Sequence, residues 1–153
     1  MNWFFDLITN PFLLTALSSW AIAQVLKVLI NAAVNRTWDL HRLFGDGGMP
    51  SGHSATVASM AAFTAFRCGT GSFEFAMAAI LAIIVCHDAM GVRLETGKQA
   101  VLLNELVEAF NILTARELPE VKLKELVGHT PSQVSAGILI GILNALFMHY
   151  VIL

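Results

Sequence analysis

A histidine preceded by small residues is the first feature of this sequence that could do chemistry. It is His53, within the run Gly47-Gly48-Met49-Pro50-Ser51-Gly52-His53-Ser54-Ala55. Pro50 suits the first position of a helix, the Ser51 side chain can cap the free amides, and Gly52 lets the backbone approach a ligand closely. The N–H groups and positive dipole end of a helix favour an anion such as phosphate. Since histidine takes up and releases a proton near neutral pH, we expect His53 to transfer a proton beside that anion.

A second histidine stands in the same kind of setting near the C-terminal end of the chain. It is His129, within Gly128-His129-Thr130-Pro131-Ser132-Gln133-Val134. Thr130 is a natural N-cap, Pro131 fits the first helical position, and Gln133 completes a capping box. Two histidines held at helix N-termini on one side of a membrane suggest a nucleophile and an acid around one phosphoryl group.

The elements that must position these histidines are apolar enough to cross a membrane. Hydrophobic residues make up 56% of the 153 residues and charged residues 13%, and the formal net charge is −2, which fits neither a soluble domain nor a nucleic-acid-binding protein. A spanning helix needs about 20 mostly apolar residues. The apolar blocks are Pro11–Val34, Ser54–Phe66 with its flanks, Phe73–Cys86 with its flanks, and Val134–Leu153. We expect a single domain, residues 1–153, that is an all-α integral membrane bundle of about four transmembrane helices.

The two polar connections that carry the histidines fall on the same face of such a bundle. With four spans, Asn35–His53 and Asp88–Ser132 lie on one side of the membrane, where their polar residues can meet. Most Lys and Arg residues lie in these two connections, so the positive-inside rule places that face in the cytoplasm. Within Gln99–Thr114, polar and apolar residues each recur at helical spacing, which predicts an amphipathic helix at the membrane interface.

These motifs resemble those of the type 2 phosphatidic acid phosphatase and vanadium haloperoxidase superfamily. Pro50-Ser51-Gly52-His53 is similar to its central motif, and Gly128–Val134 is similar to its last motif. The resemblance is closer to the small, divergent bacterial and plastid branch, which shows Gly-Gly-Met-Pro-Ser-x-His-Ser-Ala, Asp-Ala-x-Gly-Val-Arg and Gly-His-x-Pro. Here these runs are Gly47–Ala55, Asp88–Arg93 and Gly128–Pro131. The resemblance covers nearly the whole chain and implies a helical membrane phosphatase.

The resemblance implies a role for each matching residue. His129 would accept the phosphoryl group, and His53 would protonate the leaving alkoxide. The implied phosphate ligands are the Ser51 hydroxyl, the Gly52 amide, Lys27, Arg93, and either Arg42 or Arg36. The family chemistry implies no metal and no other cofactor.

Two positions near the second histidine depart from the superfamily pattern. Leu123 stands six residues before His129, where an Arg is usual, so Arg93 would have to reach the site across an insertion. Gln133 replaces the usual acidic residue four positions after the nucleophile. It can hydrogen-bond to the imidazole and set its tautomer, but it cannot stabilise an imidazolium by charge. Asp88 could take the acidic role if the fold brings it near.

Together these residues predict a membrane phosphatase that acts on a lipid phosphate. The expected reaction is metal-independent hydrolysis of a phosphate monoester or diphosphate on a phospholipid or isoprenoid, through a phosphohistidine; phosphatidate, phosphatidylglycerophosphate and polyprenyl phosphates all fit. The alternative is a catalytically weak or inactive membrane protein that binds phospholipid headgroups in a regulatory, scaffold or transport role. Gly137 and Gly141 suggest close helix contact and hence a homodimer. The expected location is a bacterial inner membrane or a plastid membrane, with the active site on the cytoplasmic face.

Overall fold

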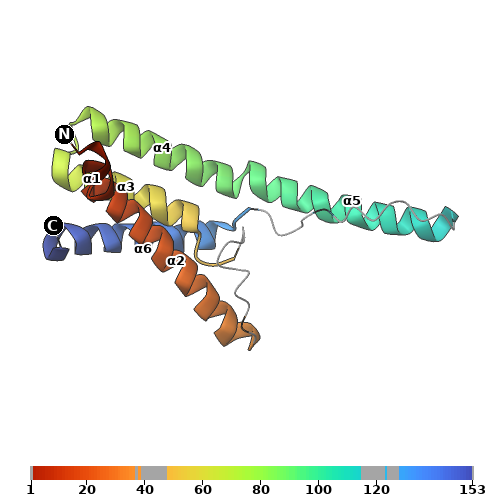
Figure 1. Cartoon of the computed structure of the whole chain (residues 1–153). Coiled ribbons are helices and arrows are strands. Elements are labelled where there is room, and N and C mark those ends of the chain that lie inside the picture. Colours follow the sequence, from red (N-terminus) through yellow and green to blue (C-terminus); the bar gives the residue numbers. More distant parts are fainter. Residues whose placement is uncertain (1, 37, 39–47, 115–122, 124–127, 153) are drawn as a thin grey trace.

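The protein is helical in the part of the chain that its structure, a computed structural model, describes: residues 2–36, 38, 48–114, 123 and 128–152. The all-α prediction is therefore confirmed (Figure 1). In chain order the elements are α1 (Trp3–Ile8), α2 (Pro11–Asn35), α3 (Gly52–Cys68), α4 (Phe73–Met90), α5 (Val92–Thr114), α6 (Pro131–Phe147) and the π-helix η2 (Met148–Ile152).

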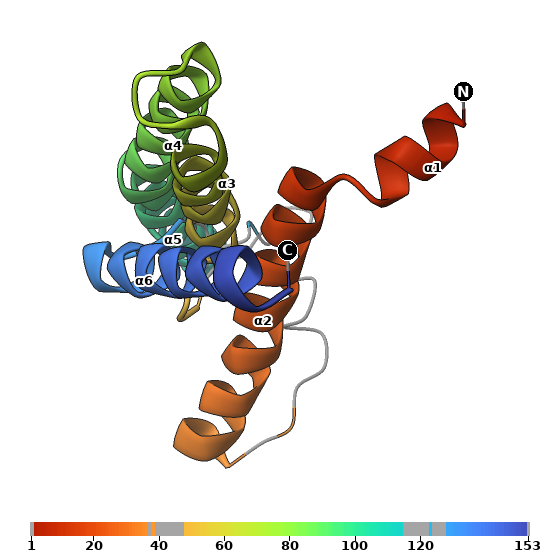
Figure 2. The ribbon, with the colours of Figure 1, turned by 90° about the vertical axis from the view of Figure 1, so that its left-hand side faces the viewer.

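Helix α3 lies at the centre of the bundle. It packs against α2, α4 and α6, and α2 and α6 also contact each other. Figure 1 shows α3, α4 and α6 running roughly side by side, and Figure 2 shows α2 crossing them obliquely. The Ser51 N–H donates to the Gln133 carbonyl oxygen (3.0 Å), and the His129 N–H donates to the Ala89 carbonyl oxygen (2.9 Å). The first bond joins the starts of α3 and α6, and the second joins the residues before α6 to the C-terminal turn of α4.

Two glycines let α3 and α6 pack with their backbones almost in contact. A Cβ atom at Gly137 would lie 2.4 Å from the Ser51 carbonyl oxygen, and one at Gly141 would lie 2.4 Å from the Ala55 carbonyl oxygen. Small residues four positions apart are a common means of close helix packing in membranes. Gly137 and Gly141, which suggested a homodimer, therefore contact α3 of the same chain. The homodimer stays a prediction, without their support.

A buried amide joins α2 to α6 at the end of the bundle far from the histidines. The Asn144 Nδ2 group lies 2.7 Å from the Ser19 hydroxyl, 2.9 Å from the Ser18 hydroxyl and 3.1 Å from the Thr15 carbonyl oxygen. Thr15 and Ser19 are completely buried. Hydrogen bonds between membrane helices contribute about 1 kcal/mol each. This polar cluster, defined by Asn144, Thr15, Ser18 and Ser19, fixes how α2 crosses α6.

Among the residues that the structure describes, three helical segments are long and apolar enough to cross a membrane: Pro11–Asn35, Phe73–Leu113 and Pro131–Val151. Helix α3, the expected second span, is not among them. Its 17 residues reach only about 26 Å at 1.5 Å per residue, whereas the hydrocarbon layer is about 30 Å thick. Three candidate spans are therefore supported where about four were predicted. The physical reason is that the small and hydroxyl side chains of α3 pack against neighbouring helices instead of facing lipid.

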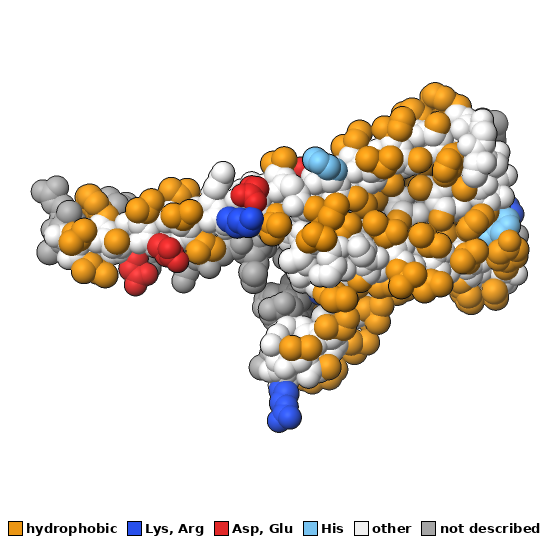
Figure 3. Space-filling view, turned by 180° about the vertical axis from the view of Figure 1, so that it is seen from behind, with side chains coloured by type: hydrophobic (Ala, Val, Ile, Leu, Met, Phe, Trp, Pro, Cys, Tyr) orange, Lys and Arg blue, Asp and Glu red, His pale blue; other side chains and the backbone are white. Residues whose placement is uncertain are grey.

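Helix α5 extends beyond the bundle as an arm. It continues the direction of α4 past Gly91, as Figure 1 shows. In Figure 3 hydrophobic side chains cover most of the visible face of the bundle, whereas acidic side chains lie on the arm and at its base, and basic side chains lie at the base of the arm and at the outer ends of the bundle. The helix predicted over Gln99–Thr114 is confirmed as the second part of α5. Its position at a membrane interface stays a prediction.

Candidate active site

The N-terminus of α3 is capped by Ser51, which is completely buried. The Ser51 Oγ atom accepts hydrogen bonds from the Ser54 N–H (3.4 Å) and the Ser54 hydroxyl (3.0 Å). Gly52 is the first helical residue, so the prediction that Pro50 takes this position was wrong. The reason is that the serine oxygen reaches an unpaired amide of the first turn only from the N-cap position. The contact of the Ser51 hydroxyl with phosphate stays a prediction.

His53 projects from the first turn of α3 and is exposed. Its ring centroid lies 6.3 Å from that of His129, with the two ring planes inclined by 59°. Reacting atoms in a near-attack arrangement lie about 3–3.5 Å apart, and the two rings are close enough for both imidazoles to border one small group. The spacing of the two imidazoles is therefore compatible with one phosphoryl group between them.

His129 is buried, with 4% of its surface exposed, and its imidazole is oriented by Gln133. The Gln133 Oε1 atom lies 3.1 Å from the Thr130 backbone nitrogen and 3.2 Å from His129 Nδ1. Since this oxygen is an acceptor for the Thr130 N–H, His129 Nδ1 must be the donor. In the neutral ring Nε2 then carries the lone pair, which is what a nucleophile needs. The capping box predicted for α6 thus also sets the tautomer of the neighbouring histidine.

Gly128 holds the loop before His129 against the start of α5. Its φ angle is +87°, and a Cβ atom there would lie 2.3 Å from the Leu94 nitrogen and 2.6 Å from the Arg93 carbonyl carbon. Only glycine adopts this backbone conformation and this close approach without strain. The contact places the backbone of Arg93 beside the His129 loop, across the insertion that separates them in the sequence.

Arg93 and Asp88 form an ion pair at the junction of α4 and α5. Arg93 Nε lies 2.7 Å from Asp88 Oδ2, and nearly half of each side chain is exposed. Asp88 precedes Ala89, whose carbonyl oxygen accepts the His129 N–H, so the pair lies close to the His129 loop. Exposed ion pairs contribute about 0–1 kcal/mol, which leaves Arg93 able to exchange its carboxylate partner for a phosphate at little cost. The roles of Arg93 as phosphate ligand and Asp88 as acidic partner stay predictions.

Helix α2 contributes three buried polar side chains on the face that meets α3: Gln24, Lys27 and Asn31 are 8%, 4% and 6% exposed. A Cβ atom at Gly52 would lie 3.5 Å from Trp20 Cδ1 and 3.6 Å from Gln24 Oε1, so this face reaches the first turn of α3. Sequence reasoning selected Lys27 but missed Gln24 and Asn31. The signal was their spacing of three and four residues from Lys27, which marks one face of a helix.

The remaining positions named from the sequence are Arg42, Gly47, Arg36 and Leu123. Arg42 and Gly47 lie outside the described residues. Arg36, the alternative to Arg42, ends α2 in a left-handed conformation with φ 54° and is exposed. Leu123, at the position where the superfamily has an Arg, pairs with α5. Its N–H and carbonyl each form a 3.0 Å hydrogen bond with the Asn104 side-chain amide, a contact that the sequence reasoning did not predict.

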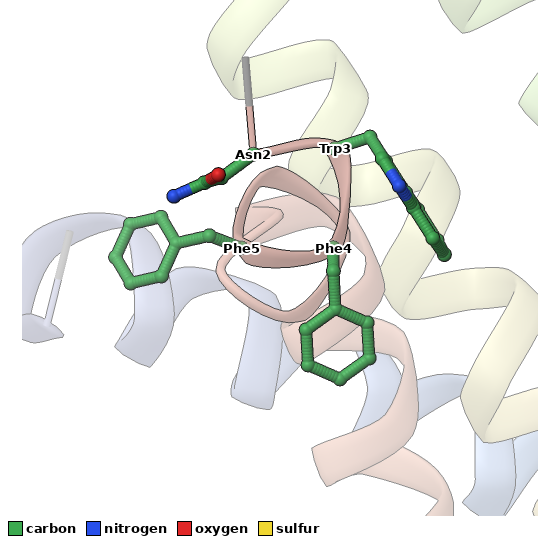
Figure 4. Close-up of a pocket in the computed structure, with 4 residues that line it drawn as sticks. All are labelled: Asn2, Trp3, Phe4 and Phe5. Carbon is green, nitrogen blue, oxygen red and sulfur yellow. The ribbon is translucent and has the colours of Figure 1, made fainter.

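A surface hollow on α1 lies away from the histidines. It is lined by Asn2, Trp3, Phe4 and Phe5. Figure 4 shows these side chains spread around a single helical turn and pointing in different directions. Helix α1 lies at the other end of the bundle from the N-termini of α3 and α6 (Figure 1). We assign this hollow no part in the site.

These features define a helical membrane protein in which two neighbouring helix N-termini each carry a histidine. The chain belongs to the Divergent PAP2 family, whose model matches residues 8–144. It is 42% identical to the protein named "Uncharacterized membrane protein YuiD" of Bacillus subtilis (strain 168), over 154 residues that cover 95% of this chain and 98% of that protein. No solved structure matches the chain. The resemblance inferred from the histidine motifs is confirmed.

Proposed function

We propose that this protein is a lipid-phosphate phosphatase that works through a phosphohistidine and without a metal ion. One observation carries the proposal: His53 and His129, 6.3 Å apart between ring centroids, project from neighbouring helix N-termini, and Gln133 holds His129 in the tautomer that can attack. A helix N-terminus favours a phosphate group. The arrangement therefore supplies a binding site, a nucleophile and a proton donor for one phosphoryl group.

The proposed reaction has two steps. His129 Nε2 attacks phosphorus, the bond between phosphorus and the lipid oxygen breaks, and His53 gives its proton to that oxygen, so a lipid alcohol leaves. His53 then takes a proton from water as the water oxygen attacks phosphorus. The bond between phosphorus and nitrogen breaks, inorganic phosphate leaves, and both histidines return to their starting states. Lys27, Arg93 and Arg42 are proposed to neutralise the phosphoryl oxygens, which is the main task in such transfers.

We propose a fourth membrane crossing by α3. It packs against α2, α4 and α6, which contain the three candidate spans, so it occupies the same depth of the membrane as they do. Its N-terminus carries His53 and its C-terminal turn carries Arg67. A short central helix is acceptable in a bilayer when its neighbours, rather than lipid, cover it.

A lipid substrate follows from where the site lies. The histidines stand at the end of a bundle whose outer surface is largely hydrophobic (Figure 3). A lipid can keep its tail beside that surface while its phosphate reaches the helix N-termini. Phosphatidate, phosphatidylglycerophosphate and polyprenyl phosphates meet this requirement. The concentration of basic residues in the connections next to the site supports a cytoplasmic active site in a bacterial membrane.

A second candidate function is headgroup binding without efficient turnover. Two observations favour it. Gln133 lacks the charge that would stabilise an imidazolium at His129, and Arg93 is paired with Asp88. A protein that binds but does not hydrolyse lipid phosphates would serve a regulatory, scaffold or transport role.

Phosphate release from a panel of lipid phosphates, with EDTA present, tests the first proposal. The detergent-purified protein is compared with His129→Ala and His53→Ala, and with His149→Ala as the matched control. His149 lies in η2, beyond the C-terminal end of α6, against Phe63 and Phe66 of α3. We expect release that is abolished by the first two substitutions and kept by the third.

Other results would change the conclusion. Release that survives both His129→Ala and His53→Ala would exclude the two-histidine mechanism. Binding of the lipid phosphates to a folded protein that releases no phosphate would favour the second candidate.

A further inference from the structure

Gln24 carries a buried hydrogen-bond acceptor that has no donor among the residues that the structure describes. The residue is 8% exposed, and its Oε1 atom is enclosed without a hydrogen-bond partner. An amide oxygen in such a position has lost its hydration, which destabilises the protein unless another group donates a hydrogen bond to it. A buried acceptor that is kept in a membrane helix is therefore a sign of a ligand that supplies the donor.

The position of this oxygen limits which chemical groups the ligand can carry. A Cβ atom at Gly52 would lie 3.6 Å from Gln24 Oε1, so the oxygen faces the first turn of α3. That turn offers N–H donors and the positive end of the helix dipole. His53 is the next residue on the same turn. A ligand that reaches Gln24 Oε1 beside this turn must offer acceptor oxygens and negative charge to the helix, and one hydrogen-bond donor to Gln24.

A phosphate monoester that keeps one proton meets both requirements. Its unprotonated oxygens accept from the helix amides, and its P–OH group donates to an amide oxygen. Sulfate has the same shape and bears no proton near neutral pH. A phosphodiester has no P–OH group. Both would leave the Gln24 acceptor unpaired.

We propose that Gln24 accepts a hydrogen bond from the P–OH group of the bound phosphate and thereby selects terminal phosphates over sulfate and phosphodiesters. The inference rests on the phosphate site of the proposed function but not on turnover. Gln24 acts as a specificity-determining residue that contacts the substrate, on the side of the phosphate that faces α2. Its place in the helix, three residues before the predicted phosphate ligand Lys27, puts both on one face of α2.

Calorimetric titration with inorganic phosphate and with sulfate, at about pH 6, where phosphate retains a proton, tests the inference on the full chain in detergent. Gln24→Met removes the acceptor and keeps an unbranched side chain of similar length, and Gln24→Leu is a second variant. Removal of an unpaired acceptor is expected to leave thermal stability unchanged or higher, so folding is not at risk. Gln99→Met, at an exposed position of α5, is the matched control.

We expect the unmodified protein to bind phosphate at least about tenfold more tightly than sulfate, since a hydrogen bond to a charged group is worth about 1.5–3 kcal/mol. Gln24→Met and Gln24→Leu should lower the phosphate affinity to that of sulfate and leave the sulfate affinity unchanged. Gln99→Met should change neither. Equal binding of the two anions by the unmodified protein, no binding of either, or an equal loss for both anions in the Gln24 variants would overturn the inference.

A titration with lipids distinguishes a lipid headgroup from free inorganic phosphate as the ligand. Dihexanoyl phosphatidate and dihexanoyl phosphatidylmethanol, which lacks the P–OH group, are titrated in the His129→Ala background so that turnover does not intervene. Tighter binding of the phosphatidate than of inorganic phosphate would assign the pocket to a lipid headgroup, whereas equal binding would assign it to free phosphate. If release from lipids depends on both histidines but anion selectivity ignores Gln24, the proposed function stands and this inference falls. If selectivity depends on Gln24 and no lipid is hydrolysed, the reverse holds.

Discussion

The N-termini of α3 and α6 start from nearly the same local sequence and end in different environments. Each begins with a hydroxyl residue as N-cap, Ser51 in α3 and Thr130 in α6, and each has a histidine within two residues of that cap. His53 follows its cap and lies exposed on the first helical turn. His129 precedes its cap and is buried between Gln133 and the end of α4.

The difference teaches that the packing around a helix start, together with the position of the cap, decides what a histidine can do. His53 lies on the part of the first turn of α3 that neighbouring helices leave exposed, where it can exchange protons with water and with a leaving group, whereas Ser54 on the same turn is buried. A residue before the cap belongs to the incoming loop, so neighbouring helices can bury it and a side chain of the next turn can fix its tautomer. His53 is therefore suited to proton transfer and His129 to attack, although their sequence motifs look alike.

The largest expected effect is a difference in how much phosphohistidine accumulates in the His53→Ala and His129→Ala variants. With an activated monoester such as p-nitrophenyl phosphate, the leaving group needs no acid, so His53→Ala should still be phosphorylated. Loss of the base for water attack should slow dephosphorylation by about 10²–10⁴-fold, so that phosphohistidine accumulates. His129→Ala should form none. Acid-labile, base-stable labelling of the protein measures both; labelling of His129→Ala would reverse the assignment.

The second prediction tests whether the packing of Gly128 against α5 positions His129. Gly128→Ala combines a positive φ with a Cβ that would collide with α5, whereas Gly69, which has the same φ of +87°, has nothing within 4 Å of such an atom. Gly69→Ala should cost about 1 kcal/mol of folding free energy. Gly128→Ala should cost about 1–3 kcal/mol more from overpacking. Thermal unfolding in detergent measures both. Equal losses of folding free energy in the two variants would show that Gly128 can move away from α5 at little cost. Packing against α5 would then not position His129.

The third prediction sharpens the role of Gln133. Gln133→Leu removes the acceptor at His129 Nδ1 and should lower kcat about 10–100-fold, the equivalent of one hydrogen bond to a group that becomes charged. Gln133→Glu keeps the acceptor and adds a charge that stabilises an imidazolium, so kcat should equal or exceed that of the unmodified protein. Because Gln133 also caps α6, the thermal stability of each variant must be measured alongside. If kcat falls in both variants in proportion to their loss of stability, Gln133 acts only as a cap of α6.

The smallest expected effect concerns Asp88, the partner of Arg93. Asp88→Asn should change the folding free energy by less than about 1 kcal/mol, because the pair is nearly half exposed. If Arg93 binds phosphate, the same substitution should lower KM, since Arg93 no longer has to leave a carboxylate. Arg93→Gln should raise KM. Steady-state kinetics on the best lipid phosphate checks both; a large fall in kcat with Asp88→Asn would instead assign Asp88 the acidic role beside His129.

Much of this protein could be predicted from the order of its residues alone. The helical membrane character follows from the apolar blocks, because a bilayer offers no partners for an unpaired backbone. The start of α6 follows from Thr130, and the cap of α3 follows from Ser51 although Pro50 was expected at the first helical position, since capping involves residues only two or three apart. The family follows from the two histidine motifs, which the match over residues 8–144 confirms.

Other features depended on contacts between distant parts of the chain. The position of Gln24 against Gly52, the collision that keeps Gly128 a glycine beside Leu94, and the use of Gly137 and Gly141 inside the chain are all decided by helices packing across the bundle. The same packing explains how α3 can carry more small and hydroxyl side chains than the three candidate spans, because neighbouring helices cover them. Local patterns place a histidine at a helix start, but only the packing of α6 against α3 and α4 exposes one histidine, buries the other and brings the two rings together. The physical reason is that capping and periodicity act within a few residues, whereas burial and close approach depend on which helices share a surface.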